Sequence, residues 1–395
     1  MATRKTNGKT NGKTTKETPC PTFTKVRNFI KRFVALDDAQ LDFSAIWAMG
    51  TWTFSPMSPS QPYTYPYIYA NGPSGSGKTV YGRDVMGAIC RQPQAFAAAT
   101  GPALFRSLVD IETEDGETTI INRYPTLSID EIDAAYNGAK DEDLRQVFNI
   151  GYKTGTYIPR AAGKVSINYP AYCPKILMGI DNGFLPQTVT NRSIRIETHI
   201  ATEEEAARLD DFFPWNVDQE AAELQQELST WAKDNAMVLR EYNPDKGDFV
   251  NRQWEISRSI IQLAHACGIE NRVRKALFSL FNRAKVVEPL KVRMYRTIFR
   301  LFETNGGVKQ DRLTSKQIFT ALTKAGIPVN ANSMTGMSYT FKEDGLSIRT
   351  SAYVAVDDPT HPAYVSAERR SHRGYLKWQF DEIFARFLIE DDDEE

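Results

Sequence analysis

A short glycine-rich stretch, GPSGSGKT at residues 72–79, constrains the fold more than any other part of the chain. It follows the β-rich run YIYAN and precedes TVYGRDVMGAIC, which reads as a helix. A strand, a glycine-rich turn and a helix in this order gather backbone N–H groups and the positive end of a helix around one point. The order therefore predicts a buried strand that leads into a phosphate-binding loop.

The loop matches the pattern G-x-x-x-x-G-K-[ST] at Gly72, Gly77, Lys78 and Thr79. Lys78 is expected to reach the β- and γ-phosphates of ATP, and Thr79 to ligate Mg²⁺. A chance match, which would leave only a glycine-rich turn, is on the order of one in a hundred for a chain of this length. The positions expected to contact the nucleotide are Gly72, Pro73, Ser74, Gly75, Ser76, Gly77, Lys78, Thr79 and Val80.

Two acidic residues, Asp130 and Glu131, follow a second β-type run, YPTLSID. Ligands of open parallel sheets bind at the carboxyl ends of the strands, so Asp130 is expected to hold Mg²⁺ through its water shell. Glu131 is expected to orient and deprotonate the water that attacks the γ-phosphate. A small-molecule kinase needs no such acid, and the pair therefore favours an NTPase. The alternative is that Glu131 caps the next helix and that Asp133 is the useful acid.

A third β-type run, PKILMGID, ends at a polar pair, Asp181 and Asn182. Either side chain could bind the attacking water and sense the γ-phosphate, and we assign Asn182 to this catalytic role. About ten residues further on, Arg192 is placed where an arginine of ring-forming ATPases enters the neighbouring subunit's site and neutralises transition-state charge. Arg195 is a second candidate for that role. The alternative for each arginine is a surface salt bridge.

The three β-type runs alternate with helical segments, which predicts an α/β fold with a parallel sheet, a P-loop NTPase core of the AAA+ kind. Further on, Thr314 and Gln317 form a capping box for a short helix, and the run that begins at Met337 alternates like a hairpin with its turn at Asp344 and Gly345. Helix, capped helix and hairpin suggest a winged-helix domain. The expected organisation is a basic disordered tail (1–24), an N-terminal helical segment (25–62), the ATPase core (63–200), a helical region (201–290), a winged-helix-like domain (291–389) and an acidic tail (390–395).

Basic and aromatic residues share a glycine-containing loop between the second and third strands. Lys153, Arg160 and Lys164 are interleaved there with Tyr152 and Tyr157. Such a loop could follow a single DNA strand by phosphate contacts and base stacking. An ordinary solvated hairpin is the alternative.

Charge distribution, cysteine spacing and apolar runs indicate the kind of protein and its cellular compartment. The net charge is -1, yet residues 1–32 carry nine Lys or Arg against Glu17 alone, and the chain ends in IEDDDEE. The cysteines are far apart in the sequence and predict scattered reduced thiols. Because no apolar run approaches the roughly 20 residues of a membrane helix and no signal peptide is visible, we expect a cytoplasmic protein.

The chain resembles an uncharacterised P-loop ATPase family of bacteriophages, plasmids and actinobacterial genomes. The resemblance extends from FIKRFVALDDAQLDFSAIWAMGTWTF through the phosphate loop, YPTLSIDEIDA and LRQVFNIGYKTG to GFLPQTVTNRSIRI and the terminal GYLKWQFDEIFARFL. It implies a role in the DNA replication of mobile elements, in a bacterial cytoplasm, because the ATPase module of this family often accompanies primase functions. Gly75 and the Asp181–Asn182 pair depart from the usual pattern of the family.

These features predict a homo-oligomeric ring, such as a hexamer, that uses ATP and Mg²⁺ to translocate on or unwind DNA, with single-stranded DNA as partner. The acidic tail would bind replication proteins. Two alternatives stay open: an AAA+ remodelling ATPase or helicase loader that acts on a protein partner, and a DNA-binding regulator switched by ATP. A packaging motor is disfavoured because no cluster of nuclease-type acids follows the core.

Overall fold

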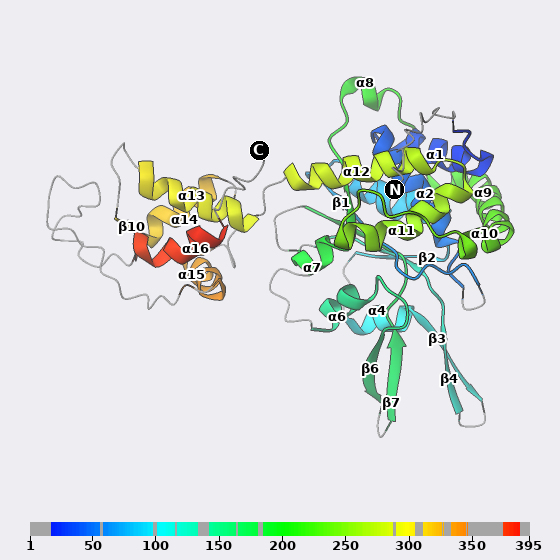
Figure 1. Cartoon of the computed structure of the whole chain (residues 1–395), viewed down its shortest axis with the longest axis horizontal. Coiled ribbons are helices and arrows are strands. Elements are labelled where there is room, and N and C mark those ends of the chain that lie inside the picture. Colours follow the sequence, from blue (N-terminus) through cyan, green and yellow to red (C-terminus); the bar gives the residue numbers. More distant parts are fainter. Residues whose placement is uncertain are drawn as a thin grey trace, which may run out of the picture.

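Two separate hydrophobic cores divide the chain. The computed structural model describes residues 17–55, 58–97, 101–114, 117–132, 142–162, 165–180, 185–286, 290–304, 311–325, 327, 333–344, 346 and 374–387. One core extends from Phe23 to Leu280, and the other from Met294 to Phe384. The described residues therefore form a larger unit and a smaller C-terminal unit, drawn in Figure 1.

A five-stranded parallel sheet forms the centre of the larger unit, in the order β2-β5-β8-β1-β9. The strands are β1 (Tyr67–Asn71), β2 (Pro93–Phe96), β5 (Thr126–Ile129), β8 (Lys175–Gly179) and β9 (Ser193–Glu197). Every residue of β1, β5 and β8 is buried, as in parallel sheets that helices cover on both faces. The prediction of an α/β fold with a parallel sheet is confirmed.

Helices cover both faces of this sheet. On one face, a π-helix, η1 (Val80–Val85), packs closely on β8, because a Cβ atom at Gly82 would lie 2.4 Å from the Met178 sulfur. On the other face, α6 (Glu142–Ile150) receives a hydrogen bond from the Tyr67 hydroxyl to the Phe148 carbonyl, at 3.0 Å. Short helices complete these layers: α3 (Met86–Ile89), α4 (Gly101–Ser107) and α7 (Gln187–Thr190).

The segments before and after the sheet-forming region pack together on the η1 face. They are α1 (Pro21–Phe33), α2 (Asp38–Thr51), α9 (Pro214–Asp234), α10 (Ala236–Glu241), α11 (Asn251–Ala266) and α12 (Glu270–Val286). The short helix α8 (Glu203–Ala206) has no buried residue and lies in the connection from β9 to α9. Helix α2 touches the sheet directly, since Trp47 donates to the Pro66 carbonyl at 2.8 Å and Gln40 to the Glu197 carbonyl at 2.9 Å. The N-terminal and helical segments therefore share one core with the strands rather than forming separate domains.

Asp42, which is only 4% exposed, joins three of these helices. Its carboxylate accepts hydrogen bonds from Arg27 on α1 at 2.6 Å and from Arg272 on α12 at 2.5 Å. Part of the expected tail, residues 17–24, also belongs to the described structure. Helix α1 begins at Pro21, inside the expected tail, and the Glu17 carboxylate accepts hydrogen bonds from the backbone N–H groups of Asn271 and Arg272.

Two antiparallel hairpins extend from the same side of the larger unit, the lower side in Figure 1. One pairs β3 (Val109–Glu114) with β4 (Glu117–Asn122), and the other pairs β6 (Tyr157–Ala162) with β7 (Val165–Pro170). The second hairpin is the one that the sequence predicts between the second and third strands of the sheet.

The C-terminal unit contains α13 (Leu290–Thr304), β10 (Arg312–Thr314), α14 (Ser315–Lys324), α15 (Met334–Glu343), β11 (Gly374–Leu376), the 3-10 helix η5 (Lys377–Phe380) and α16 (Asp381–Phe387). The predicted capping box at Thr314 and Gln317 is confirmed at the start of α14. The predicted strand that begins at Met337 is wrong. This stretch is helix α15, whose Met337 and Phe341 share the buried face at i, i+4 spacing, so alternation over a few residues was a misleading signal. Gly345, in the expected turn, lies outside the described residues. Strand β10 pairs instead with the distant β11.

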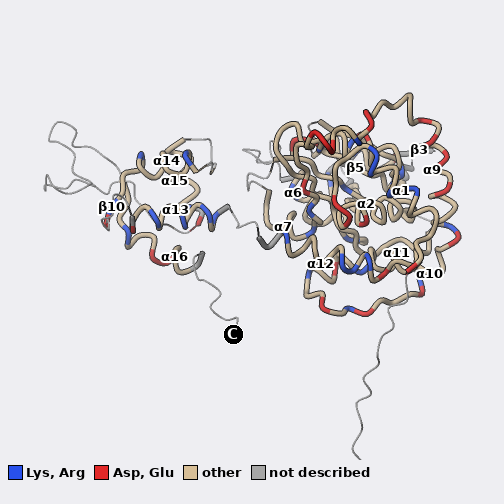
Figure 2. Tube along the Cα trace, turned by 90° about the horizontal axis from the view of Figure 1, so that it is seen from above, with Lys and Arg blue, Asp and Glu red and all other residues tan. Residues whose placement is uncertain are grey.

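Lys and Arg recur along α12 and α13, whereas elsewhere on the larger unit the two charges are interspersed (Figure 2). Among the described helices, none is both long and apolar enough to cross a bilayer.

Candidate nucleotide site

The phosphate-loop sequence and the acidic pair lie at the same edge of the sheet. Strand β1 leads into residues 72–79, and β5 leads into Asp130 and Glu131. The two strands are separated by β8, which lies between them in the sheet. The carboxyl ends of these parallel strands therefore bring Lys78, Thr79 and Asp130 together above β8, where ligands of open α/β sheets bind.

Glycines give the loop its conformation. Gly75 and Gly77 have φ values of +78° and +80°, in the left-handed region that a side chain disfavours, and a Cβ atom at either position would meet nothing within 4 Å. The space beside both glycines can thus admit a ligand. Gly72 is required for a different reason, since a Cβ atom there would lie 2.3 Å from the Thr198 carbonyl oxygen.

Side chains inside the site are already connected by hydrogen bonds. The Thr79 hydroxyl donates to Asp130 Oδ2 at 2.7 Å. The Lys78 ammonium donates to the carbonyls of Gly72 and Pro73, at 2.8 and 2.7 Å, and is thereby folded over the loop. A hydroxyl and a carboxylate at this distance can share a hard divalent cation, and the Lys78 ammonium can turn towards a phosphate.

Glu131 stands at the end of β5 in an unusual backbone conformation. Its φ is +50°, a region that non-glycine residues rarely adopt, and its N–H donates to Asp130 Oδ1 at 2.9 Å. The backbone of Asp130 is itself held by a hydrogen bond from its N–H to the Phe96 carbonyl at 2.9 Å. The Glu131 side chain is exposed beside Asp130. Strained backbone of this kind concentrates at functional sites.

Strand β9 and the residue after it support the loop, in part through residues that the sequence analysis missed. The Thr198 hydroxyl lies 2.7 Å from the Ser76 hydroxyl, and both side chains are buried. Arg195 donates to Asn71 Oδ1 at 2.9 Å, directly before the loop. No local motif marks Asn71 or Thr198. Only the pairing of β9 with β1 brings Thr198 to Gly72.

The expected arginine at the subunit boundary lies at the opposite edge of the sheet. The Tyr67 N–H donates to the Arg192 carbonyl at 2.9 Å, so Arg192 stands where β1 begins, whereas the loop starts where β1 ends. Five residues of parallel strand rise roughly 16 Å. The Arg192 guanidinium lies 4.8 Å from the centre of the Tyr152 ring and donates to the Thr188 carbonyl. Arg192 is thus distant from the loop of its own chain, and Arg195 is the arginine beside it.

The residues expected to contact DNA are separated in the structure. Lys153 lies in the turn after α6, with its ammonium 4.9 Å from the centre of the Tyr63 ring, and a hydrogen bond to Tyr63 is the main cause that raises its pKa. Arg160 lies within β6, beyond the exposed Tyr157. Tyr152, one of the aromatic residues expected to stack on bases, is 7% exposed and packs against two arginine side chains.

Several predicted residues lie outside the described part of the chain. They are Asn182 and Asp181 at the third strand, Asp133 after the second strand, and Lys164 in the loop between β6 and β7. The same holds for both charged ends, residues 1–16 and 388–395.

The loop geometry fits a nucleoside triphosphate with its magnesium ion. The open space beside Gly75 and Gly77 admits phosphate oxygens, and Lys78 offers a positive charge. Thr79 and Asp130 offer the hard oxygen ligands that Mg²⁺ prefers when it arrives with substrate phosphates.

Comparison with known proteins concerns mainly the C-terminal half. Residues 199–387 are similar to the model of a family described as a protein of unknown function, DUF3631. The matched region begins directly after Thr198, so it contains none of the loop, Asp130 or Glu131. No curated protein matches the chain.

Proposed function

We propose that this protein is a P-loop ATPase of the AAA+ or helicase kind that couples ATP hydrolysis to translocation on DNA or to its unwinding. The observation that carries the proposal is the 2.7 Å hydrogen bond between Thr79 and Asp130. It joins Thr79, the residue after Lys78 in one strand-loop-helix unit, to Asp130, the acid that follows a second, non-adjacent strand. Magnesium-dependent phosphoryl transfer needs this pair of ligands in one place.

The roles of the individual side chains follow from their positions. The Lys78 ammonium would leave the carbonyls of Gly72 and Pro73 and bind the β- and γ-phosphates. Thr79 and Asp130 would hold Mg²⁺, directly and through water. Glu131, exposed beside Asp130, would take the proton of the attacking water. Asn182 or Asp181 would bind that water from the end of β8.

A ring assembly is the proposed setting for Arg192. Because this residue stands roughly 16 Å from the loop of its own chain, it could complete only the site of a second copy. To do so, its guanidinium would have to leave the Tyr152 ring and bind the negative charge that develops on the γ-phosphate in the transition state. The β6–β7 hairpin, with Arg160 and Tyr157, is the proposed contact to a DNA strand.

The first test is steady-state ATP hydrolysis by the purified chain, with and without single-stranded and double-stranded DNA, at low and moderate salt. Magnesium-dependent turnover that DNA stimulates, less so as salt rises, is the expected result for a motor that grips phosphates. Lys78→Ala should abolish turnover, with Lys233→Ala, an exposed lysine on α9, as the matched control. Unchanged turnover in Lys78→Ala would remove the phosphate-loop assignment.

The same experiment separates the other functions. Turnover that is indifferent to DNA would favour a remodelling ATPase or helicase loader with a protein partner. Tight ATP binding without turnover would favour a DNA-binding regulator switched by ATP.

A further inference from the structure

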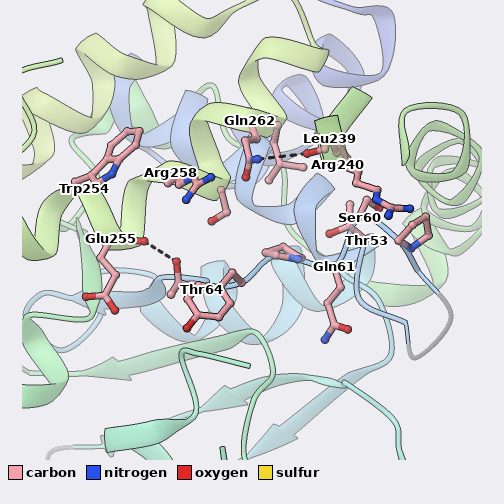
Figure 3. A pocket seen from close by; sticks show the side chains of 15 residues that line it. Thr53, Ser60, Gln61, Thr64, Leu239, Arg240, Trp254, Glu255, Arg258 and Gln262 are labelled. Carbon is pink, nitrogen blue, oxygen red and sulfur yellow. Dashed lines mark hydrogen bonds between the residues drawn. The ribbon is translucent and has the colours of Figure 1, made fainter. Parts of the chain in front are cut away.

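A pocket separate from the candidate nucleotide site lies between α10, α11 and the loop that leads into β1. Its volume is about 370 Å³. Figure 3 shows Trp254, Arg258 and Gln262 of α11 along one wall, and Arg240 of α10 at the other end, near Thr53 and Ser60. The loop residues from Pro59 to Thr64 form the facing wall. Since β1 begins just after this loop, the pocket lies at the opposite edge of the sheet from Gly72.

The pocket offers hydrogen-bond donors and positive charge. Arg240 and Arg258 both line it, and both side chains are exposed. Ser259, which is 4% exposed, also lines it, and its hydroxyl has no hydrogen-bond partner among the described residues. Buried polar groups are costly when unpaired, so this hydroxyl and the two arginines favour a ligand rich in acceptor oxygens.

Glu255, the acid in the pocket wall, does not cancel the preference for a ligand rich in acceptor oxygens. The Glu255 carboxylate accepts hydrogen bonds from Arg252 at 2.5 Å and from the Tyr152 hydroxyl at 3.1 Å. Its charge is therefore neutralised on the side of α11 that faces Tyr152. The remaining charged side chains that line the pocket are the two arginines. An anionic ligand fits this balance better than a cationic one.

Aromatic rings add a second type of contact. Trp254 lines the pocket on α11, and Tyr63, which is 62% exposed, lines the facing loop. Aromatic rings beside cationic side chains bind nucleic acid bases by stacking while the cations bind phosphate. A pocket of this volume is at the small end of ligand sites and holds a unit of nucleotide size rather than a protein element.

The pocket is also connected to the base of the β6–β7 hairpin. The Thr154 N–H donates to the Tyr63 carbonyl at 3.0 Å, and the Tyr65 N–H donates to the Tyr152 carbonyl at 2.8 Å. The Lys153 ammonium lies beside the Tyr63 ring. A strand that enters the pocket would thus pass a further cation at the hairpin base.

We propose that this pocket binds one nucleotide unit of single-stranded DNA, with the base against Tyr63 and Trp254 and its two flanking phosphates against Arg258 and Arg240. The proposal rests on the proposed function, since it supplies that motor with a second grip on its DNA. It adds a DNA contact on α10 and α11 to the contact proposed for the β6–β7 hairpin.

The test is photo-crosslinking of the full chain, without ATP, to an oligothymidylate that carries 5-iodo-deoxyuridine, followed by mapping of the crosslinked peptides. Crosslinks on peptides that contain Tyr63 or Trp254 are the expected result. Crosslinks confined to the β6–β7 hairpin, or no binding of DNA, would overturn the proposal. Because no ATP is present, a protein without turnover can still pass this test, and a DNA-stimulated ATPase can still fail it.

Binding measurements on two variants complete the test. Arg258→Glu and Tyr63→Ala should each weaken oligonucleotide binding about tenfold, as expected for loss of one phosphate contact or one stacked base. Arg208→Glu is the matched control, because Arg208 is exposed and pairs with Glu204 far from the pocket. Equal effects of Arg258→Glu and Arg208→Glu would contradict the proposal. Displacement of the oligonucleotide by equimolar thymidine monophosphate would instead assign the pocket to a free nucleotide and would equally overturn it.

Discussion

At the carboxyl edge of the sheet, the candidate nucleotide site consists of only a few side chains. Thr79 and Asp130 are 51 positions apart in the chain, yet their oxygens are 2.7 Å apart. Gly72, Gly75 and Gly77 provide space rather than contacts. Glu131 has a positive φ, which strains its backbone, and its side chain is exposed. The candidate site thus combines one exposed acid, Glu131, one cation, Lys78, and the oxygen-bearing side chains of Thr79 and Asp130.

Glu131→Gln tests the role of this exposed acid. The amide keeps the size of the side chain but cannot take a proton, so ATP turnover should fall by roughly 10²- to 10⁴-fold while nucleotide binding is retained. Single-turnover hydrolysis and equilibrium binding of a fluorescent ATP analogue measure the two effects separately. Glu223→Gln, at an exposed glutamate on α9, serves as control. Full activity of Glu131→Gln would transfer the role to Asp133.

Cys20 and Cys267 correct the expectation of scattered thiols. The Cys20 N–H donates to the Cys267 carbonyl at 3.0 Å, and a hydrogen bond from the Cys267 thiol lowers the pKa of Cys20 to about 7. Burial raises the pKa of Cys267. Cys20 also begins α1, where its sulfur accepts the Phe23 N–H at 3.4 Å. Their closeness arises from the packing of α1 against the end of α11, which no spacing in the sequence reveals.

This pair predicts a pH-dependent reactivity. Because the thiolate is the nucleophile, alkylation of Cys20 by iodoacetamide should rise with pH through about 7, below the ordinary range of a cysteine. The buried Cys90 provides an internal control that should react only after unfolding, since burial raises its pKa. Peptide mapping by mass spectrometry follows both rates. Half-maximal reactivity of Cys20 near pH 8.5 would contradict the assigned hydrogen bond.

At the scale of elements, the base of the β6–β7 hairpin is held by a buried lysine. Lys175 begins β8, is 0% exposed, and donates to the carbonyls of Gly151, Ala171 and Cys173 at 2.8–3.1 Å. Three acceptors match the three donors of an ammonium group. Burial lowers the pKa of this group, but the carbonyls compensate its charge. Lys175 thus joins the turns on either side of the hairpin to the central sheet.

Lys175→Met should destabilise the larger unit by about 3 kcal/mol, because it leaves buried carbonyls without donors while filling the same space. Urea unfolding measures this change as a lower midpoint with an unchanged slope. Lys153→Met makes the same chemical change at a nearby half-buried lysine, whose ammonium lies beside the Tyr63 ring, and should have a smaller effect, within about 1 kcal/mol. Equal stability of the two variants would show that the hairpin base does not depend on Lys175.

At the scale of the whole molecule, helices from both ends of the larger unit are joined on one face of the sheet. Asp42 binds Arg27 and Arg272, which lie on helices that precede and follow all five strands of the sheet. The candidate nucleotide site occupies one edge of the sheet, whereas Arg192 and the pocket beneath α11 occupy the other. In an assembly where the Arg192 edge of one copy faces the phosphate-loop edge of the next, Arg192 would lie beside the phosphate loop of that neighbouring copy.

Mixing two inactive variants tests this arrangement. Arg192→Ala should reduce turnover by roughly 10³-fold if the arginine stabilises transition-state charge in a neighbour. Mixed with Glu131→Gln subunits, it should regain measurable activity, because an intact Glu131 then meets an intact Arg192 across an interface. A mixture of Lys78→Ala with Glu131→Gln, both defective in the same site, is the control without rescue. Absence of rescue in the first mixture would argue against the ring.

The sequence by itself determined the α/β class, the parallel strands that precede the loop and the acidic pair, and the capped helix at Thr314, because these depend on local periodicity, turn chemistry and side-chain reach along a few residues. Only the tertiary structure decided the strand order that separates β1 from β5, the contact of Thr198 with the loop, the meeting of Cys20 with Cys267, and the helical state of the stretch that begins at Met337. Those features arise from contacts between residues distant in the chain. Local propensity is too weak to specify them against competing arrangements of similar energy.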